Sequence, residues 1–140
     1  MSTESPHTRA WSAAELAALD LSPLIHVAGA RSDGTLRPFV QIGHVRLGQD
    51  ELIRSLNGTG GTWYQGAIRT GRGEIDVDGR RIRVAFIADA GREDEVDHAL
   101  RARYGNDSGV RRMMRPPARE ATLRVVPLAE PATSDLKGAA

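Results

Sequence analysis

The chain has 140 residues, of which 40% are apolar and 26% charged, and this composition is typical of one globular domain. Nineteen basic side chains oppose eighteen acidic ones, and a net charge of +1 excludes a broad electrostatic attraction to nucleic acid or to an anionic membrane. The absence of cysteine excludes disulfides and thiol catalysis, and no apolar run approaches the ~20 residues of a membrane span.

We expect a polar tail at each end of a single folded domain. Residues 1–10 are polar and lack the apolar segment of a signal peptide, so we expect a disordered tail on a cytoplasmic protein. Residues 129–140 have no apolar periodicity and are expected to be disordered as well. The folded domain is then expected to span residues 11–128.

The first half of the chain predicts one short helix followed by strands. Ser12–Glu15 has the spacing of a capping box, which marks the start of a helix. Residues 24–28 and 39–47 have the apolar content of strands, and Gly43 inside the second suggests a bulge. Residues 52–55 predict one more short strand.

The second half predicts a hairpin, a helix and a last strand. Residues 74–77 and 81–86 alternate polar and apolar side chains around Asp78-Gly79, a dipeptide that favours a tight two-residue turn. Residues 93–104 open with acids, close with arginines and repeat apolar side chains at intervals of four, which indicates a helix. Residues 122–126 predict the last strand.

The connecting segments set the expected topology. Residues 57–61 form a glycine-rich loop, residues 63–69 are either a short helix or irregular, and residues 111–119 contain two adjacent prolines and predict a loop. About six strands joined by short turns should pair antiparallel, because parallel pairing needs long crossovers. The expected fold is mainly β (α+β), a small antiparallel barrel with helices outside; a flat antiparallel sheet with helices on one face is the alternative.

The four histidines do not have the pattern of a metal site. No two of them have close helical spacing and no acidic cluster completes a ligand set, so no metal is expected. His26 and His44 lie in predicted strands, where either could act as an acid or base near neutral pH. A serine hydrolase is excluded because the sequence has no Gly-x-Ser-x-Gly turn.

The glycine-rich loop has the neighbours of a binding site. Arg54 and Ser55 precede it, and an arginine, a hydroxyl and exposed backbone donors can together hold a phosphate. Trp63 and Tyr64 follow it, and adjacent aromatic side chains can cover a flat ring. The structural alternative is that the aromatic side chains are core anchors and Arg54 is a solvated strand residue.

A series of segments also carries a family resemblance. These segments are Gly34–Pro38, Val45–Gly48, Leu52–Gly58, Trp63–Ala67, Gly73–Phe86, Val96–Tyr104 and Ala121–Pro127. In this order and spacing the chain resembles a bacterial family of unknown function within the flavin-binding split-barrel superfamily. Pyridoxamine phosphate oxidases, flavin reductases and deazaflavin-dependent nitroreductases belong to the same superfamily.

The resemblance implies a six-stranded antiparallel split β-barrel with short flanking helices, a homodimer, and an FMN or deazaflavin groove at the dimer interface. The matching cofactor-binding positions are Arg37 (or Arg31, near the same turn), Arg54, Ser55, Gly58, Trp63 and Tyr64. The expected function is a small-molecule oxidoreductase in which the cofactor transfers hydride and Tyr64 can donate a proton to the reduced substrate.

The chain also departs from the family pattern at two positions. Gly43 and Leu52 stand where the family usually has aromatic side chains. This loss would either enlarge the pocket or remove the cofactor. The alternative function is therefore a cofactor-free split barrel that binds a small molecule, as a carrier or as an acid–base isomerase or cyclase using His44 and Tyr64.

Overall fold

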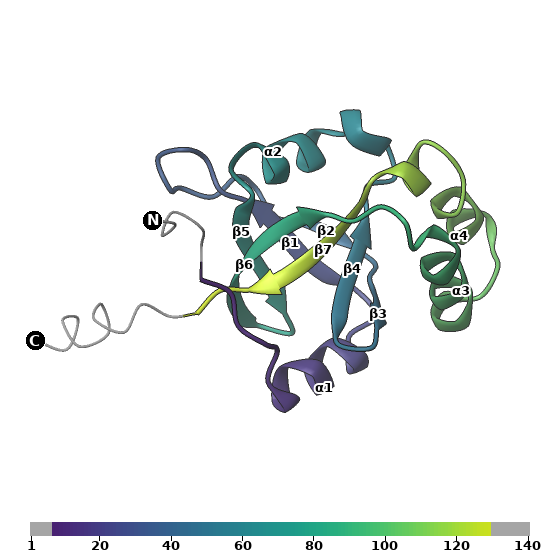
Figure 1. Ribbon diagram of the computed structural model, residues 1–140, viewed down its shortest axis with the longest axis horizontal. Helices are drawn as coiled ribbons and strands as arrows, with labels where there is room; N and C mark the ends of the chain where they lie inside the picture. Colours follow the sequence, from purple (N-terminus) through teal and green to yellow (C-terminus); the bar gives the residue numbers. More distant parts are fainter. Residues whose placement is uncertain (1–6, 130–140) are drawn as a thin grey trace, which may run out of the picture.

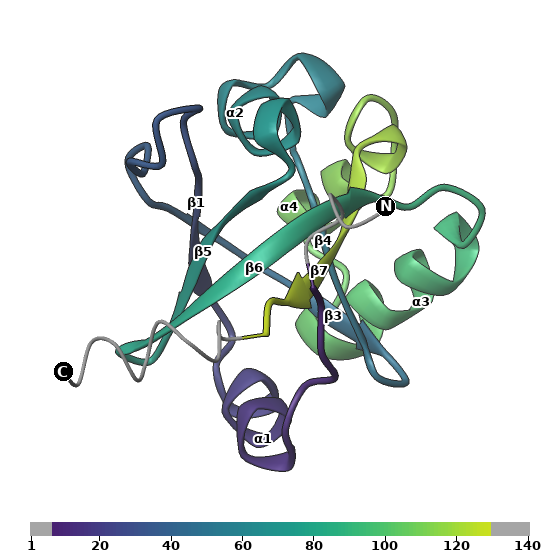
Figure 2. The same ribbon diagram turned by 60° about the vertical axis from the view of Figure 1, so that its left-hand side comes forward.

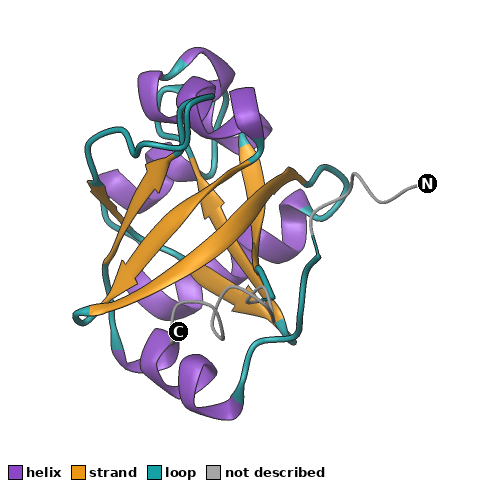
Figure 3. Ribbon diagram, turned by 90° about the vertical axis from the view of Figure 1, so that its left-hand side faces the viewer, coloured by secondary structure: helices purple, strands orange, loops and turns teal. Residues whose placement is uncertain are grey.

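The computed structural model describes residues 7–129, in which one antiparallel sheet curls into a barrel with helices at its ends and on one side (Figures 1 and 3). The strands are β1 (Ile25–Gly29), β2 (Val40–Ile42), β3 (Val45–Leu47), β4 (Asp50–Arg54), β5 (Arg72–Val77), β6 (Arg80–Ala88) and β7 (Thr122–Pro127). The helices are α1 (Ala13–Leu21), α2 (Thr62–Thr70), α3 (Glu93–Tyr104) and α4 (Ser108–Met113), with short 3₁₀ helices at Gly58–Gly60 and Ala118–Glu120.

The order of the strands explains why the sheet closes. That order is β2-β1-β5-β6-β7-β4-β3, with every neighbouring pair antiparallel. Strands β2 and β3 therefore lie at opposite edges, yet only Gly43 and His44 separate them along the chain. A link of two residues cannot cross an open sheet of this width, so the sheet curls until its edges meet (Figure 2). The antiparallel barrel is confirmed; the strand expected at 39–47 is two strands, which gives seven rather than six.

Two apolar clusters hold the barrel and its outer helices together. The predicted inward face of the hairpin, which includes Ile75, Val77 and Val84, is buried inside the barrel. A second cluster lies between the outer face of β3 and β4 and the helices α3 and α4. Its buried members are Val45, Leu52, Val96, Leu100 and Val110. Strand β4 is thus covered on both faces, and its polar residues Glu51 and Arg54 are therefore buried.

Short-range sequence signals determine where several helices and turns begin. Ser12 Oγ accepts from the Glu15 backbone N–H at 3.1 Å, and the Glu15 carboxylate accepts from the Ser12 N–H at 2.8 Å, as the capping box predicted. The Arg9 guanidinium beside Glu15 lowers the pKa of that carboxyl from 4.5 to about 2. The turn residues Asp78 and Gly79 have φ of 52° and 86°, which confirms the tight hairpin.

Other segments differ from the expectation. Residues 108–113 form α4, started by Asp107, whose side chain accepts from the Val110 N–H at 3.0 Å, so helix replaces the first part of the expected loop at 111–119. Thr8 forms a bridge with Leu128, so part of the expected N-terminal tail pairs with the barrel. The rest of both expected tails, residues 1–6 and 130–140, lies outside the described residues. Within residues 7–129, no helix has the length and hydropathy to cross a bilayer.

Candidate functional site

The connection between β4 and α2 is a tight loop that depends on glycine. Ser55 is 1% exposed, and a Cβ placed on Gly61 would lie 2.6 Å from the Ser55 Oγ. Gly58 has φ +79°, and its Cβ would lie 2.6 Å from the Cβ of Pro117. The segment expected to be a flexible loop is therefore closely packed, and it fixes where α2 begins.

The N-terminus of α2 has no side-chain cap. Gly61 gives no side-chain cap, and nothing lies within 4 Å of the position that a Cβ on Gly60 would take. The first helical hydrogen bond runs from the Gln65 N–H to the Gly61 carbonyl, so the N–H groups of Thr62–Tyr64 precede it. Uncapped N–H groups and the helix dipole together favour an anion at such an end.

Arg37 lies against the same helix. A Cβ on Gly66 would lie 2.5 Å from the Arg37 Cδ and 2.7 Å from its Nε, so the missing side chain at Gly66 makes room for this arginine. The Nε of Arg37 is buried and has no hydrogen-bond partner within residues 7–129. Gly66 follows Trp63 by three positions, so Arg37 packs on the face of α2 that carries Trp63.

The two aromatic residues of α2 have different environments. Their ring centroids lie 6.4 Å apart with an interplanar angle of 62°, an edge-on contact. Tyr64 is 7% exposed and belongs to the barrel core, whereas Trp63 is half-buried and packs against that core from outside. The core-anchor alternative therefore describes Tyr64, and Trp63 is the ring that a ligand could reach.

Arg31 lies on the same β1–β2 loop as Arg37 but lines a different cleft. This cleft of about 120 Å³ also contains Arg72, Arg83 and one carboxylate, Glu74. Arg31 donates to the Leu36 carbonyl at 2.8 Å, which holds its side chain across the loop. Three guanidinium groups against one carboxylate leave this cleft positive. The arginines of the predicted hairpin were the sequence signal that could have indicated this cleft.

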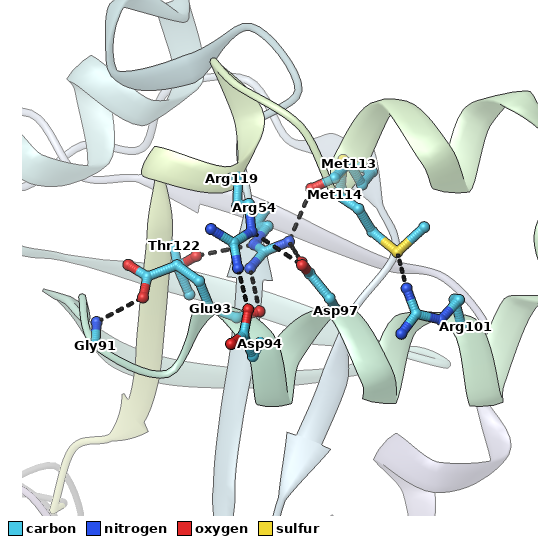
Figure 4. A network of polar contacts seen from close by, with 10 residues as sticks. All are labelled: Arg54, Gly91, Glu93, Asp94, Asp97, Arg101, Met113, Met114, Arg119 and Thr122. Atoms are coloured by element: carbon cyan, nitrogen blue, oxygen red, sulfur yellow. Dashed lines mark hydrogen bonds and ion pairs between the residues drawn. The ribbon is translucent and has the colours of Figure 1, made fainter.

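Arg54 belongs to a buried structural network instead of the expected phosphate site (Figure 4). Its side chain is 1% exposed. Its three nitrogens donate to the Thr122 Oγ1 at 2.9 Å, the Asp97 Oδ1 at 2.6 Å, the Met113 carbonyl at 2.8 Å and the Glu93 carbonyl at 3.2 Å. These acceptors join β4 to β7, α3 and the end of α4, so we remove Arg54 from the candidate cofactor residues.

His44 lies at the other end of the barrel from Tyr64. It is 2% exposed, and its Nε2 lies 2.6 Å from the carbonyl of Ser22, which caps the end of α1. Helices α1 and α2 cover opposite ends of the barrel (Figure 1). The proposed pairing of His44 with Tyr64 in acid–base chemistry is therefore not supported. His26 is exposed on β1, opposite Gln41 and Asp76, and within residues 7–129 it forms no hydrogen bond or ion pair with His44.

The partner of His44 is Glu51, which the sequence analysis did not single out. The His44 Nδ1 lies 2.5 Å from the Glu51 Oε2, and the Glu51 side chain is fully buried. Burial raises the pKa of the Glu51 carboxyl above its usual 4.5, although His44 opposes the shift. A carboxylate next to Leu52 and Ile53 in an apolar strand was the signal that could have indicated it.

This raised pKa predicts a pH-dependent stability. The folded protein binds the Glu51 proton more tightly than the unfolded chain does, so below the unfolded pKa this proton contributes its full stabilisation to the fold. The contribution is lost as the pH rises toward the folded pKa. Above pH 4.5, the free energy of unfolding of the wild type should therefore fall relative to that of Glu51→Gln, by at most about 1.4 kcal/mol per pH unit. Chemical denaturation from pH 4 to 9 measures this, with the exposed Glu95→Gln as control. A constant difference would contradict the raised pKa.

The two departures from the family pattern do not open a pocket. A Cβ on Gly43 would lie 3.2 Å from the Tyr104 hydroxyl, so Tyr104 of α3 occupies the space beside it. Leu52 is 1% exposed and packs in the cluster beneath α3. Within residues 7–129, no group of three or more His, Asp or Glu side chains could hold a metal ion.

The sequence matches, over residues 15–125, a family described as uncharacterized proteins conserved in bacteria (DUF2255). The chain belongs to this family. No curated protein matches the sequence.

Several solved structures share the fold. A conserved hypothetical protein from Mycobacterium tuberculosis superposes with a TM-score of 0.58 at 14% identity, over 92% of this chain and 87% of that one. A protein of Bacteroides thetaiotaomicron named for 5-nitroimidazole antibiotic resistance gives 0.54 at 13% identity, over 91% and 86%. An F420 reductase gives 0.52 at 15% identity, over 81% and 92%. Together they confirm the split-barrel fold.

Proposed function

We propose that this protein is a small-molecule oxidoreductase that binds a flavin or a deazaflavin beside α2, in a groove completed by a second copy of the chain. The observation that carries the proposal is the arrangement around α2. An uncapped helix N-terminus and a half-exposed tryptophan lie on one short helix, and an arginine whose Nε has no acceptor packs against that helix. The names of the F420 reductase and of the nitroimidazole-resistance protein with the same fold support it.

Each residue has a defined task in this proposal. Arg37 and the first N–H groups of α2 hold the phosphate, since a guanidinium and a helix N-terminus both bind oxyanions. Trp63 borders the ring system and excludes water from one side of it. Gly58 and Gly61 keep the loop close to Ser55, so that the helix end stays in place. The bound cofactor supplies the hydride chemistry.

Titration of the full-length protein with FMN and with a deazaflavin, followed by ring fluorescence, tests this function. We expect one of the two to bind, and Arg37→Gln to weaken it roughly 10- to 150-fold, as loss of a charged hydrogen bond does. Arg69→Gln, which removes an exposed charge from the same helix, should leave the affinity unchanged. A wild-type protein that binds neither compound at high micromolar concentration would exclude the proposed cofactors.

The second copy is tested separately, by sedimentation of the protein with and without the bound cofactor. We expect a dimer in both samples. If the protein is a monomer and still binds the cofactor with an affinity that depends on Arg37, the cofactor site is supported and the groove shared between two copies is contradicted.

A further inference from the structure

A second cleft lies at the end of the barrel opposite α2. It is about 560 Å³ in volume and opens between the C-terminal half of α1, the β3–β4 hairpin and α3. Its lining consists of Asp20, Val45, Arg46, Gly48, Ala99, Ala102 and Arg103. We call it the α1–α3 cleft. Its small apolar side chains leave room for a ligand, and its three charged residues decide which ligand would fit.

Two of those charges cancel each other. The Arg46 Nε and Nη2 donate to the two carboxylate oxygens of Asp20, both at 2.8 Å, in a two-point ion pair. This pair lowers the pKa of the Asp20 carboxyl, so Asp20 stays ionised and Arg46 stays neutralised across the ordinary pH range.

Arg103 has no such partner. Within residues 7–129, no carboxylate forms an ion pair with it; its Nε donates to the Tyr104 hydroxyl at 3.0 Å, and its Nη2 donates to the Ser22 carbonyl at 2.6 Å and to the Leu19 carbonyl at 3.2 Å. These neutral acceptors fix the orientation of the guanidinium without cancelling its charge. No hydrogen bond within the described residues involves its Nη1, and the side chain is only half-buried.

The buried pair behind Arg103 does not cancel its charge either. The Ser22 carbonyl can only accept, so the His44 Nε2 at 2.6 Å must carry a hydrogen. The His44 Nδ1 and the Glu51 Oε2 lie 2.5 Å apart, and burial raises the pKa of the Glu51 carboxyl, which favours its uncharged form. Glu51 therefore does not place a carboxylate charge behind Arg103. The cleft therefore carries a net charge of +1, located on Arg103.

We propose that the α1–α3 cleft binds a small organic acid with a single carboxylate, which accepts from the Arg103 Nη1 while its hydrocarbon part lies over Val45, Ala99 and Ala102. One uncompensated charge fits a monoanion better than a phosphate dianion. The apolar lining fits a short aliphatic or aromatic body rather than a sugar or a polyol. This site is independent of the proposed cofactor site, because α2 and its residues take no part in it.

Probe acids and their uncharged amides test the proposal. The full-length protein is titrated with butanoate, butanamide, benzoate and benzamide, and the backbone ¹H–¹⁵N signals of Gly48, Ala99 and Ala102 are followed. We expect the acids to shift these signals and to bind at least about tenfold more tightly than the amides, as a charged hydrogen bond does. Equal binding of acid and amide, or shifts confined to other parts of the protein, would overturn the proposal.

Two variants distinguish the contribution of the Arg103 charge to binding from that of the space in the α1–α3 cleft. Arg103→Gln should abolish the preference for acids, and Ala102→Leu should weaken acids and amides alike by filling the cleft from an exposed helix position. Arg101→Gln, an exposed neighbour on α3, is the control and should change neither. If Arg103→Gln does not fold, Ala102→Leu decides: unchanged acid binding in that variant would also overturn the proposal. The FMN titration of Ala102→Leu should match that of the wild type.

Discussion

Arg54→Met is expected to lower the free energy of unfolding by about 3–5 kcal/mol, a large part of the stability of an ordinary domain. Arg54 is nearly completely buried, and its removal takes a charged donor from acceptors on β7, α3 and the end of α4. Methionine fills much of the same volume without replacing any hydrogen bond. Urea denaturation measures the loss.

The matched control for this variant is Arg119→Met. Arg119 contacts the same carboxylate, donating to the Asp97 Oδ2 at 2.9 Å, but its side chain is 32% exposed. Exposed ion pairs contribute about 1 kcal/mol or less, so this variant should be nearly as stable as the wild type. If Arg54→Met lowers the free energy of unfolding only slightly and weakens the affinity for FMN, Arg54 belongs to the cofactor site.

Arg54 also shows why sequence alone could not predict the environment of one candidate site residue. The residues of a strand alternate between two faces, so Arg54 lies on the same face of β4 as Leu52. That face is covered by α3, which contributes Val96 and Leu100. A helix 40 residues further along the chain therefore decides whether Arg54 meets solvent, a ligand or the protein interior. Neither the loop motif nor the family resemblance contains that information.

Elements governed by local signals were predicted well. The turn at Asp78-Gly79, the capping box and the bounds of α3 all depend on residues within a few positions of each other. The helix α4 was missed because Ser108 and Gly109 are weak helix formers and two prolines follow. The packing of Ser55 against the glycine-rich loop follows from their adjacency in the chain, whereas the position of Arg37 on Gly66 depends on how β1 packs against α2.

Gly29→Ala is expected to destabilise the protein by about 3 kcal/mol, because the added methyl would meet the backbone of α2. A Cβ on Gly29 would lie 2.7 Å from the carbonyl carbon and oxygen of Gly66 and 2.8 Å from the Ala67 Cα, and these atoms can move only with the whole helix. The helix that carries Trp63 would shift from the sheet, so FMN affinity should fall as well. Denaturation and FMN titration of one sample measure both effects.

Gly66→Ala adds a methyl to α2 itself and should affect cofactor binding more than stability. Its Cβ would meet the Cδ and Nε of Arg37, the flexible part of a side chain, while alanine in a helix is favoured over glycine by about 0.5–1 kcal/mol. We expect unchanged or higher stability with weaker binding of the cofactor, because Arg37 must leave its place against Gly66. Gly60→Ala, with nothing within 4 Å, should change neither property. If Gly66→Ala binds the cofactor, FMN or deazaflavin, as tightly as the wild type does, Arg37 does not hold it from its observed position.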